Sequence, residues 1–260
     1  MSRIADSLRK GRGLICYLTA GYPSEELFIE HAMACVEGGA DVLEIGVPFT
    51  DPVADGKVIQ LTSQKALDNG ITPMRVFQLT RELRSRTDVP LVLMGYYNPI
   101  FQVGEGRYVQ LAREAGADGL IVPDLPLEES SGLRGACVHN EMDLIQLVGP
   151  TTSEERMIRI ARASMGFLYV VSALGTTGAR SSLSTEVGPL VQRAKKAAGS
   201  LPVGVGFGIS QHEQTERLYR EGADAAIVGS ALLKNIIDGA TPGDTCRFVA
   251  SLRDARISQA

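Results

Sequence analysis

Residues 41–47 read DVLEIGV and are followed at once by the loop PFTDPVADG, residues 48–56. The run is nearly continuous in apolar residues instead of alternating, which is typical of a strand buried on both faces of a parallel sheet. Glu44 is the glutamate inside it. This stretch therefore predicts a parallel α/β sheet that carries an acidic group in one strand and a polar loop directly after it.

Similar apolar runs recur along the chain, each followed by a loop and then by a segment with helical spacing. Strands are expected at residues 13–19, 41–47, 90–96, 118–123, 143–149, 166–171, 202–207 and 224–229. Helices are expected between them at 25–37, 57–69, 104–115, 128–140, 153–163, 184–198, 211–221 and 230–237, with extra helices at 2–10, 73–86 and 243–257. The tripeptide Gly-Ala-Asp at 39–41, 116–118 and 222–224 indicates a repeated αβ turn in which glycine ends the helix.

Eight such units give about 32 residues per unit, close to what a (β/α)8 barrel needs. We therefore expect an α/β fold, a (β/α)8 TIM barrel, with additional helices at both ends and after the second strand, folded as one domain over residues 1–260. A doubly wound open sheet is the rival fold. Its glycine-rich fingerprint, G-x-G-x-x-G directly after the first strand, does not occur in this sequence.

Composition and charge exclude several classes of function. The chain is 44% hydrophobic and 22% charged, with a formal net charge of −4, and its charges are interleaved, so neither nucleic acid nor an anionic membrane is expected as a partner. The cysteines and histidines form no C-x-x-C or H-E-x-x-H pattern, so no metal site and no disulfide framework is expected; they are Cys16, Cys35, Cys137, Cys246, His31, His139 and His212. No apolar stretch approaches the roughly 20 residues of a membrane span, and a cytoplasmic location is expected.

Acidic residues near the second strand are the first candidates for chemistry, since barrel active sites lie at the carboxyl ends of the strands. Burial of Glu44 between Leu43 and Ile45 should raise its pKa and make it a general acid or base near neutrality. The structural alternative is a glutamate paired with a cation or turned outward. The following loop contains Asp51 and Asp55, either of which could supply a second carboxylate for acid–base chemistry. Both could also be ordinary turn residues, and their spacing does not favour one aspartate over the other.

Glycine-rich loops follow the last three strands: GTTGA (175–179), GFGIS (206–210) and GSA (229–231). Backbone amides in such loops and at helix starts bind phosphate in many barrels, although tight turns alone would explain the glycines. Ser210 and Ser230 are expected to cap the helices that follow. Tyr169, in the sixth strand, suits either core packing or a substrate contact. The stretch MGYYNPIF (94–101) ends a strand in aromatic residues that suit a ligand or a partner protein.

The sequence closely resembles the tryptophan synthase alpha subunit family over essentially its whole length. The resemblance is carried by LTAGYPS (18–24), DVLEIGVPFTDPVADG (41–56), LMGYYNPI (93–100), GLIVPDLPLEES (119–130), GTTGAR (175–180) and GVGFGIS (204–210). It implies retro-aldol cleavage of indole-3-glycerol phosphate to indole and glyceraldehyde 3-phosphate, without metal or organic cofactor. It also implies an α2β2 heterotetramer in which a β subunit, the holder of pyridoxal phosphate, converts the indole to L-tryptophan.

The same resemblance assigns roles by motif. Glu44 matches the catalytic acid–base glutamate, and Asp55, in Ala-Asp-Gly, matches the aspartate beside the indole nitrogen, which separates it from Asp51. The remaining matches are phosphate-binding positions (Gly178, Gly208, Gly229 and Ser230), substrate-pocket positions (Tyr169 and Phe207) and the mobile-loop threonine that meets the aspartate (Thr177). Two departures bear on loop closure and partner coupling: Lys57 stands where proline is common, and residues 173–176 read ALGT, with Thr176 in place of the more usual valine.

Three functions remain open at this point. The chain could be an α subunit that works with a β subunit, a free-standing indole-3-glycerol-phosphate lyase, or a non-catalytic barrel that binds a phosphate ligand or activates a partner. Retention of Glu44, Asp55 and the glycine loops argues against the third. For a β subunit, the expected contact surface is the rim formed by Pro48–Asp55 and Tyr96–Phe101, which is rich in apolar and aromatic residues and poor in charge.

Overall fold

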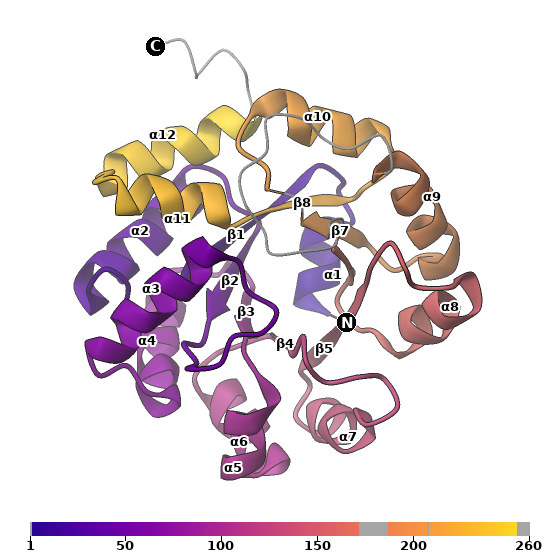
Figure 1. Cartoon of the computed structure of the whole chain (residues 1–260), viewed down its shortest axis with the longest axis horizontal. Coiled ribbons are helices and arrows are strands. Elements are labelled where there is room, and N and C mark those ends of the chain that lie inside the picture. The colour runs from indigo at the N-terminus through magenta and orange to yellow at the C-terminus, as the bar shows by residue number, and fades with distance from the viewer. Residues whose placement is uncertain (1, 172–186, 207, 254–260) are drawn as a thin grey trace.

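The computed structural model describes residues 2–171, 187–206 and 208–253 and shows a closed barrel of parallel strands surrounded by helices (Figure 1). The strands are β1 (Gly13–Thr19), β2 (Val42–Gly46), β3 (Leu91–Met94), β4 (Gly119–Ile121), β5 (Asp143–Val148), β6 (Leu168–Val171), β7 (Val203–Gly206) and β8 (Ala225–Val228). They pair in chain order, and β8 closes on β1. The expected (β/α)8 barrel is confirmed, and the open sheet is excluded.

Helices follow the strands closely as predicted. They are α2 (Glu25–Glu37), α3 (Lys57–Asp68), α6 (Glu105–Glu114), α7 (Ser131–His139), α8 (Glu154–Ala163), α9 (Val187–Ala198), α10 (His212–Arg220) and α11 (Ser230–Ile237). The expected extra helices are α1 (Arg3–Leu8), α4 (Pro73–Arg86) and α12 (Pro242–Arg253). No described helix has both the length and the apolar character needed to cross a membrane.

Helix α5 (Tyr97–Val103) was not expected, because residues 94–101 were interpreted as an aromatic strand end. The third strand stops at Met94, and the chain turns into this short helix within three residues. Pro99 lies in the first turn of α5, where a missing backbone N–H costs little. The aromatic residues therefore belong to a helix on the rim of the barrel and not to the sheet.

The inside of the barrel is apolar at the end where the strands begin. Its buried side chains come from successive strands and from α1: Ile4, Leu8, Ile15, Val42, Val92, Ile121, Ile145, Phe167, Ala225 and Ile227. Ile4 and Leu8 are fully buried, so α1 closes this end of the barrel. A larger cluster fills the space between strands and outer helices. An active site inside the barrel must therefore lie toward the carboxyl ends of the strands.

The repeated Gly-Ala-Asp turn is confirmed, and it fixes the ends of three strands. Gly39, Gly116 and Gly222 have φ of 99°, 94° and 101°, a backbone conformation that glycine adopts without strain. The carboxylates of Asp41, Asp118 and Asp224 accept hydrogen bonds from the backbone N–H of Leu14, Leu91 and Val203 at 2.8, 2.9 and 2.7 Å. Each aspartate thus ties the start of its own strand to the neighbouring strand.

Asp118 is the most buried of the three and should stabilise the fold most. Its side chain also lies 3.2 Å from Nη1 of Arg3 and 3.6 Å from Nη1 of Arg84. Asp118→Ala should lower the free energy of unfolding by about 3–5 kcal/mol, because it leaves a strand amide without its acceptor and the largely buried guanidinium of Arg84 without its carboxylate partner. Urea unfolding followed by circular dichroism measures this. Asp238→Ala, which breaks an exposed pair with Lys234, should cost less than about 1 kcal/mol; similar losses in both variants would contradict the assignment.

Candidate active site

A cavity of about 290 Å³ lies at the carboxyl end of the barrel. Its walls combine apolar side chains with two acids, two tyrosines and the glycine loops: Tyr17, Glu44, Ala54, Asp55, Ile59, Met94, Pro123, Leu147, Tyr169, Val171, Gly206, Gly208, Ile227, Gly229 and Ser230. Most of the sequence candidates in the described residues therefore line one cavity. Such a space, apolar with a few converging polar groups, is typical of a small-molecule site.

Glu44 occupies the middle of β2 with its side chain inside the barrel. It pairs in register with Tyr17 of β1 and Val92 of β3, and only 1% of its surface is exposed. Its Oε2 atom has no hydrogen-bond partner among the described residues. Burial, with a smaller contribution from the nearby charge of Asp55, raises the pKa of Glu44 to about 8. Near neutral pH the group therefore holds a proton that it can donate.

Asp55 reaches the same cavity from the loop after β2. Its backbone N–H donates to the Pro52 carbonyl at 3.1 Å, and its carbonyl accepts from Nε2 of Gln60 at 2.8 Å. Burial raises the pKa of Asp55 to about 6, and a hydrogen bond from Tyr96 opposes that rise. Above this pH the carboxylate is ionised. Two acids in one cavity thus have pKa values far enough apart to take different roles.

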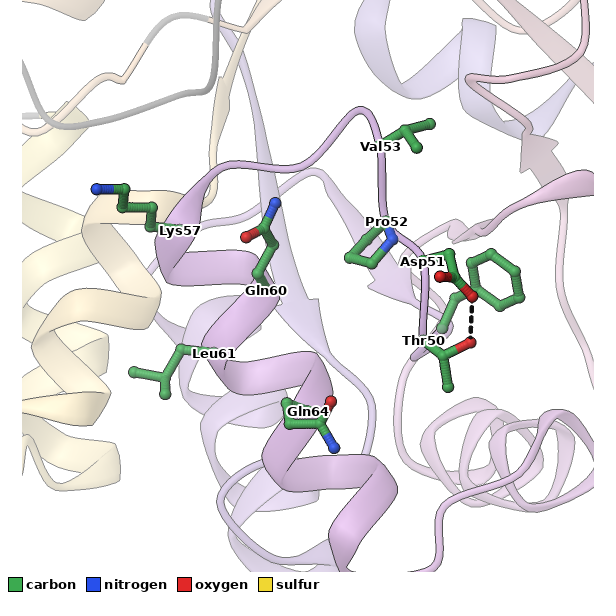
Figure 2. A pocket seen from close by; sticks show the side chains of 9 residues that line it. Thr50, Asp51, Pro52, Val53, Lys57, Gln60, Leu61 and Gln64 are labelled. Carbon is green, nitrogen blue, oxygen red and sulfur yellow. Dashed lines mark hydrogen bonds between the residues drawn. The ribbon is translucent and has the colours of Figure 1, made fainter.

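Asp51 is separated from this pair by the path of the loop. It is exposed, accepts a hydrogen bond from the Thr50 hydroxyl at 2.7 Å, and lines a different hollow of about 590 Å³. Figure 2 shows that hollow between the loop at Thr50–Val53 and one side of α3, with the dashed Thr50–Asp51 hydrogen bond. The geometry therefore brings Asp55, and not Asp51, into the cavity of Glu44.

The described glycine positions lie beside the acids. Gly208, with φ of 51°, follows β7, while Gly229 and Ser230 stand at the start of α11, and all three line the cavity. The expectation that Ser230 caps α11 is wrong: Ser230 is the first helical residue, Gly229 takes the cap position, and no side chain caps this helix. Gln211, not Ser210, precedes α10. The uncapped amides of α11 suit an anion.

Tyr169 lies in β6 and points into the cavity. A Cβ atom added to Gly206 would lie 2.8 Å from its hydroxyl oxygen, so glycine in β7 makes room for this ring. Burial raises the pKa of Tyr169 well above its usual value, which keeps the hydroxyl neutral. Thr177, Gly178 and Phe207, and the altered residues 173–176, lie outside the described residues.

Two further tyrosines lie in or beside the site: Tyr17, which was not singled out from the sequence, and Tyr96, which was named only within the aromatic stretch 94–101. Tyr17 lines the cavity from β1, and the Tyr96 hydroxyl accepts a hydrogen bond from the backbone N–H of Ala54 at 3.0 Å. A signal for Tyr17 was present, since it interrupts an apolar strand between Cys16 and Leu18 just as Glu44 interrupts the next. The sequence placed Tyr96 on the same rim as the loop Pro48–Asp55, but it did not predict the hydrogen bond between Tyr96 and Ala54.

Histidines and cysteines lie elsewhere. His31 is buried between α2 and α12, with Nδ1 2.8 Å from the Thr245 hydroxyl oxygen, and none of the three histidines lines the cavity. All four cysteines are free. Within the described ranges no group of three or more histidine, cysteine or acidic side chains is arranged to hold a metal ion.

Comparison with known sequences agrees with this architecture. The sequence model of the tryptophan synthase alpha chain family matches residues 4–251. The chain is 47% identical over 231 residues to the tryptophan synthase alpha chain of Methanosarcina barkeri (strain Fusaro / DSM 804), covering 89% of this chain and 86% of that one. It is 46% identical over 259 residues to the alpha chain of Prochlorococcus marinus (strain MIT 9313), covering 98% and 94%.

Solved structures give the same result. Tryptophan synthase from Mycobacterium tuberculosis superposes with a TM-score of 0.89 at 32% identity, over 97% of both chains. The tryptophan synthase complex from Pyrococcus furiosus gives a TM-score of 0.87 at 34% identity, over 93% of this chain and 98% of that one. The chain thus belongs to the tryptophan synthase alpha chain family, and it is a lyase that cleaves indole-3-glycerol phosphate to indole and glyceraldehyde 3-phosphate.

Proposed function

We propose that Glu44 and Asp55 perform this cleavage, with the substrate phosphate bound by backbone amides around Gly208, Gly229 and Ser230. The observation that supports the proposal is their common cavity, in which a protonated and an ionised carboxyl group lie beside an uncapped helix start. Tyr169 and Phe207 would border the indole. For Thr177 and Gly178 we propose the roles that the resemblance implies, an interaction with Asp55 and phosphate binding.

The chemistry divides between the two acids. Protonated Glu44 donates to C3 of the indole ring, which makes the ring cationic, and the resulting carboxylate then takes the proton of the neighbouring glycerol hydroxyl. The O–H electrons form the aldehyde C=O, the bond to C3 breaks, and its electrons restore the aromatic ring. Asp55 stays ionised and stabilises the positive charge at N1. Glu44 donates one proton and recovers one proton, so the cleavage leaves it in its starting state. We therefore propose that this chain needs no cofactor, and that pyridoxal phosphate belongs to a β subunit.

Substitution of the carboxylates tests this division. Glu44→Gln and Asp55→Asn should each reduce the lyase rate by roughly 10²-fold or more, the scale of lost acid–base catalysis. Asp51→Asn should cost much less, because Asp51 is exposed outside the cavity. The measurement is indole release from indole-3-glycerol phosphate by the purified chain.

The pH profile provides a second readout for the same variants. Asp55, with a pKa of about 6, must be ionised, and Glu44, with a pKa of about 8, must be protonated. The value of kcat/KM should therefore rise through pH 6 and fall through pH 8. Asp55→Asn should remove the acid limb. Near-normal turnover by folded Glu44→Gln would refute the mechanism.

Phosphate binding is tested at Gly208. Gly208→Asp should weaken binding of glyceraldehyde 3-phosphate by about tenfold or more, since the added carboxylate repels the dianion. The matched control is Gly199→Asp, at a glycine with a similar φ of 60° and no atoms near its Cβ position. Calorimetric titration gives both affinities. Unchanged affinity in Gly208→Asp would exclude this phosphate site.

A β subunit is the proposed partner, in an α2β2 assembly. The rim expected to contact it has exposed apolar side chains: Val53 is 81% and Phe101 64% exposed. The hollow of Figure 2 is lined by residues of the same loop and of α3. A partner bound there would hold the Asp55 loop in place and raise the rate by shifting its population toward a closed state. By reciprocity, a ligand in the cavity should change the affinity for the partner.

Sedimentation of the chain with a cognate β subunit, combined with lyase rates of each mixture, tests this assembly. Complex formation should raise the rate, and Phe101→Asp should weaken the complex by tenfold or more, because a charge at the centre of an apolar contact is left unpaired. Val138→Asp is the control, at a similarly exposed residue (59%) at the other end of the barrel, near the end of α7. No complex at micromolar concentration, with a high unassisted rate, would favour the free-standing lyase.

A further inference from the structure

The Tyr96 side chain joins the Asp55 loop to the barrel. Its hydroxyl oxygen accepts from the Ala54 backbone N–H at 3.0 Å, and as a donor facing the neighbouring residue this hydroxyl lowers the pKa of the Asp55 carboxyl group. Its ring stacks on Phe49, with 5.2 Å between ring centroids and 27° between planes. One residue, 4% exposed, therefore contacts both ends of the loop that carries the proposed catalytic aspartate.

The backbone on either side of Tyr96 is fixed by other elements. Gly95 N–H donates to the Ile121 carbonyl of β4 at 3.1 Å, and Tyr97 N–H donates to the Asp124 carboxylate at 2.9 Å. Within the loop, by contrast, the hydrogen bonds of Asp55 run to Pro52 and to Gln60 at the start of α3. The backbone at Tyr96 is thus fixed by hydrogen bonds to other parts of the barrel, whereas the hydrogen bonds of Asp55 run only to residues near it in the sequence.

We propose that Tyr96 is a positioning residue for the lyase reaction, whose hydroxyl holds the loop backbone at Ala54 and so sets the location of the Asp55 carboxylate. This inference rests on the role of Asp55 proposed above. It adds a residue on a separate element that does not itself touch the reacting atoms.

The electrostatic setting of Asp55 explains why such a donor matters. Four titratable groups of the described structure interact electrostatically with Asp55: Glu44 on β2, Tyr17 on β1, Tyr169 on β6 and Tyr96 itself. None of these four is a cation, and burial favours the protonated form of Asp55. A hydroxyl that donates to the carboxylate favours the ionised form. Its loss should therefore raise the pKa of Asp55.

Tyr96→Phe isolates this effect, because phenylalanine keeps the stacked ring and removes only the hydroxyl. The acid limb of the kcat/KM profile should move to higher pH by about one unit, the size expected for one hydrogen bond to a charged group. At pH values below that limb, the variant should be about tenfold slower than the unaltered chain. Added to Asp55→Asn, the same change should cost less than about twofold, since no ionisable carboxylate remains at position 55.

Tyr219→Phe is the matched control. It also removes a largely buried tyrosine hydroxyl, which donates to the Gly13 carbonyl at 2.9 Å at the opposite end of the barrel, and its pH profile should match that of the unaltered chain. Thermal unfolding of each variant establishes that it is folded.

The other possible outcomes distinguish the role of Tyr96 from that of Asp55. An unmoved acid limb in Tyr96→Phe, or an equal loss in the presence and absence of Asp55→Asn, would show a purely structural role and overturn the inference. Slow Asp55→Asn beside normal Tyr96→Phe would overturn the inference and leave the proposed function standing. Normal turnover by Asp55→Asn would overturn both.

Discussion

Glu44 is a carboxyl group that the barrel withdraws from water, and the rest of the site is arranged around that burial. Its neighbours in the strand, Leu43 and Ile45, pack between the sheet and the outer helices, so the alternation of the strand turns Glu44, like Val42, into the barrel. Below it the interior is filled by apolar side chains and closed by α1. Ionisation there is costly, which is why the pKa rises to about 8.

The second carboxylate could not share this environment without losing its own function. Two acids close together in a low-dielectric cavity resist double ionisation, so one of them keeps its proton. The structure gives Asp55 more contact with polar groups: it lies on a loop, at 7% exposure, and receives a hydrogen bond from Tyr96. Strand burial for one acid and loop placement for the other thus produce a proton donor and an anion from the same chemical group.

Sequence patterns predicted what depends on local chain properties. Continuous apolar runs located the eight strands, and Gly-Ala-Asp located three αβ turns, since both follow from burial and backbone conformation near the residues concerned. The choice between Asp51 and Asp55 needed the path of the loop in space. Helix α5 was missed because Pro99 and its aromatic neighbours do not resemble a helix. The order of the strands placed Tyr96 and the Asp55 loop on one rim, but the Tyr96–Ala54 hydrogen bond depends on side-chain geometry that no local pattern gives.

The glycines of β7 have a second use that phosphate binding alone does not explain. Gly206 begins the segment GFGIS, yet its missing side chain leaves room for the Tyr169 ring, just as Gly46 leaves room for Tyr17. Both tyrosines line the cavity of Glu44. A side chain at Gly206 would push the ring into the space of the substrate while Gly208 remained free to bind phosphate. The volume for the organic part of the substrate and the anion site therefore depend on different glycines of one short motif.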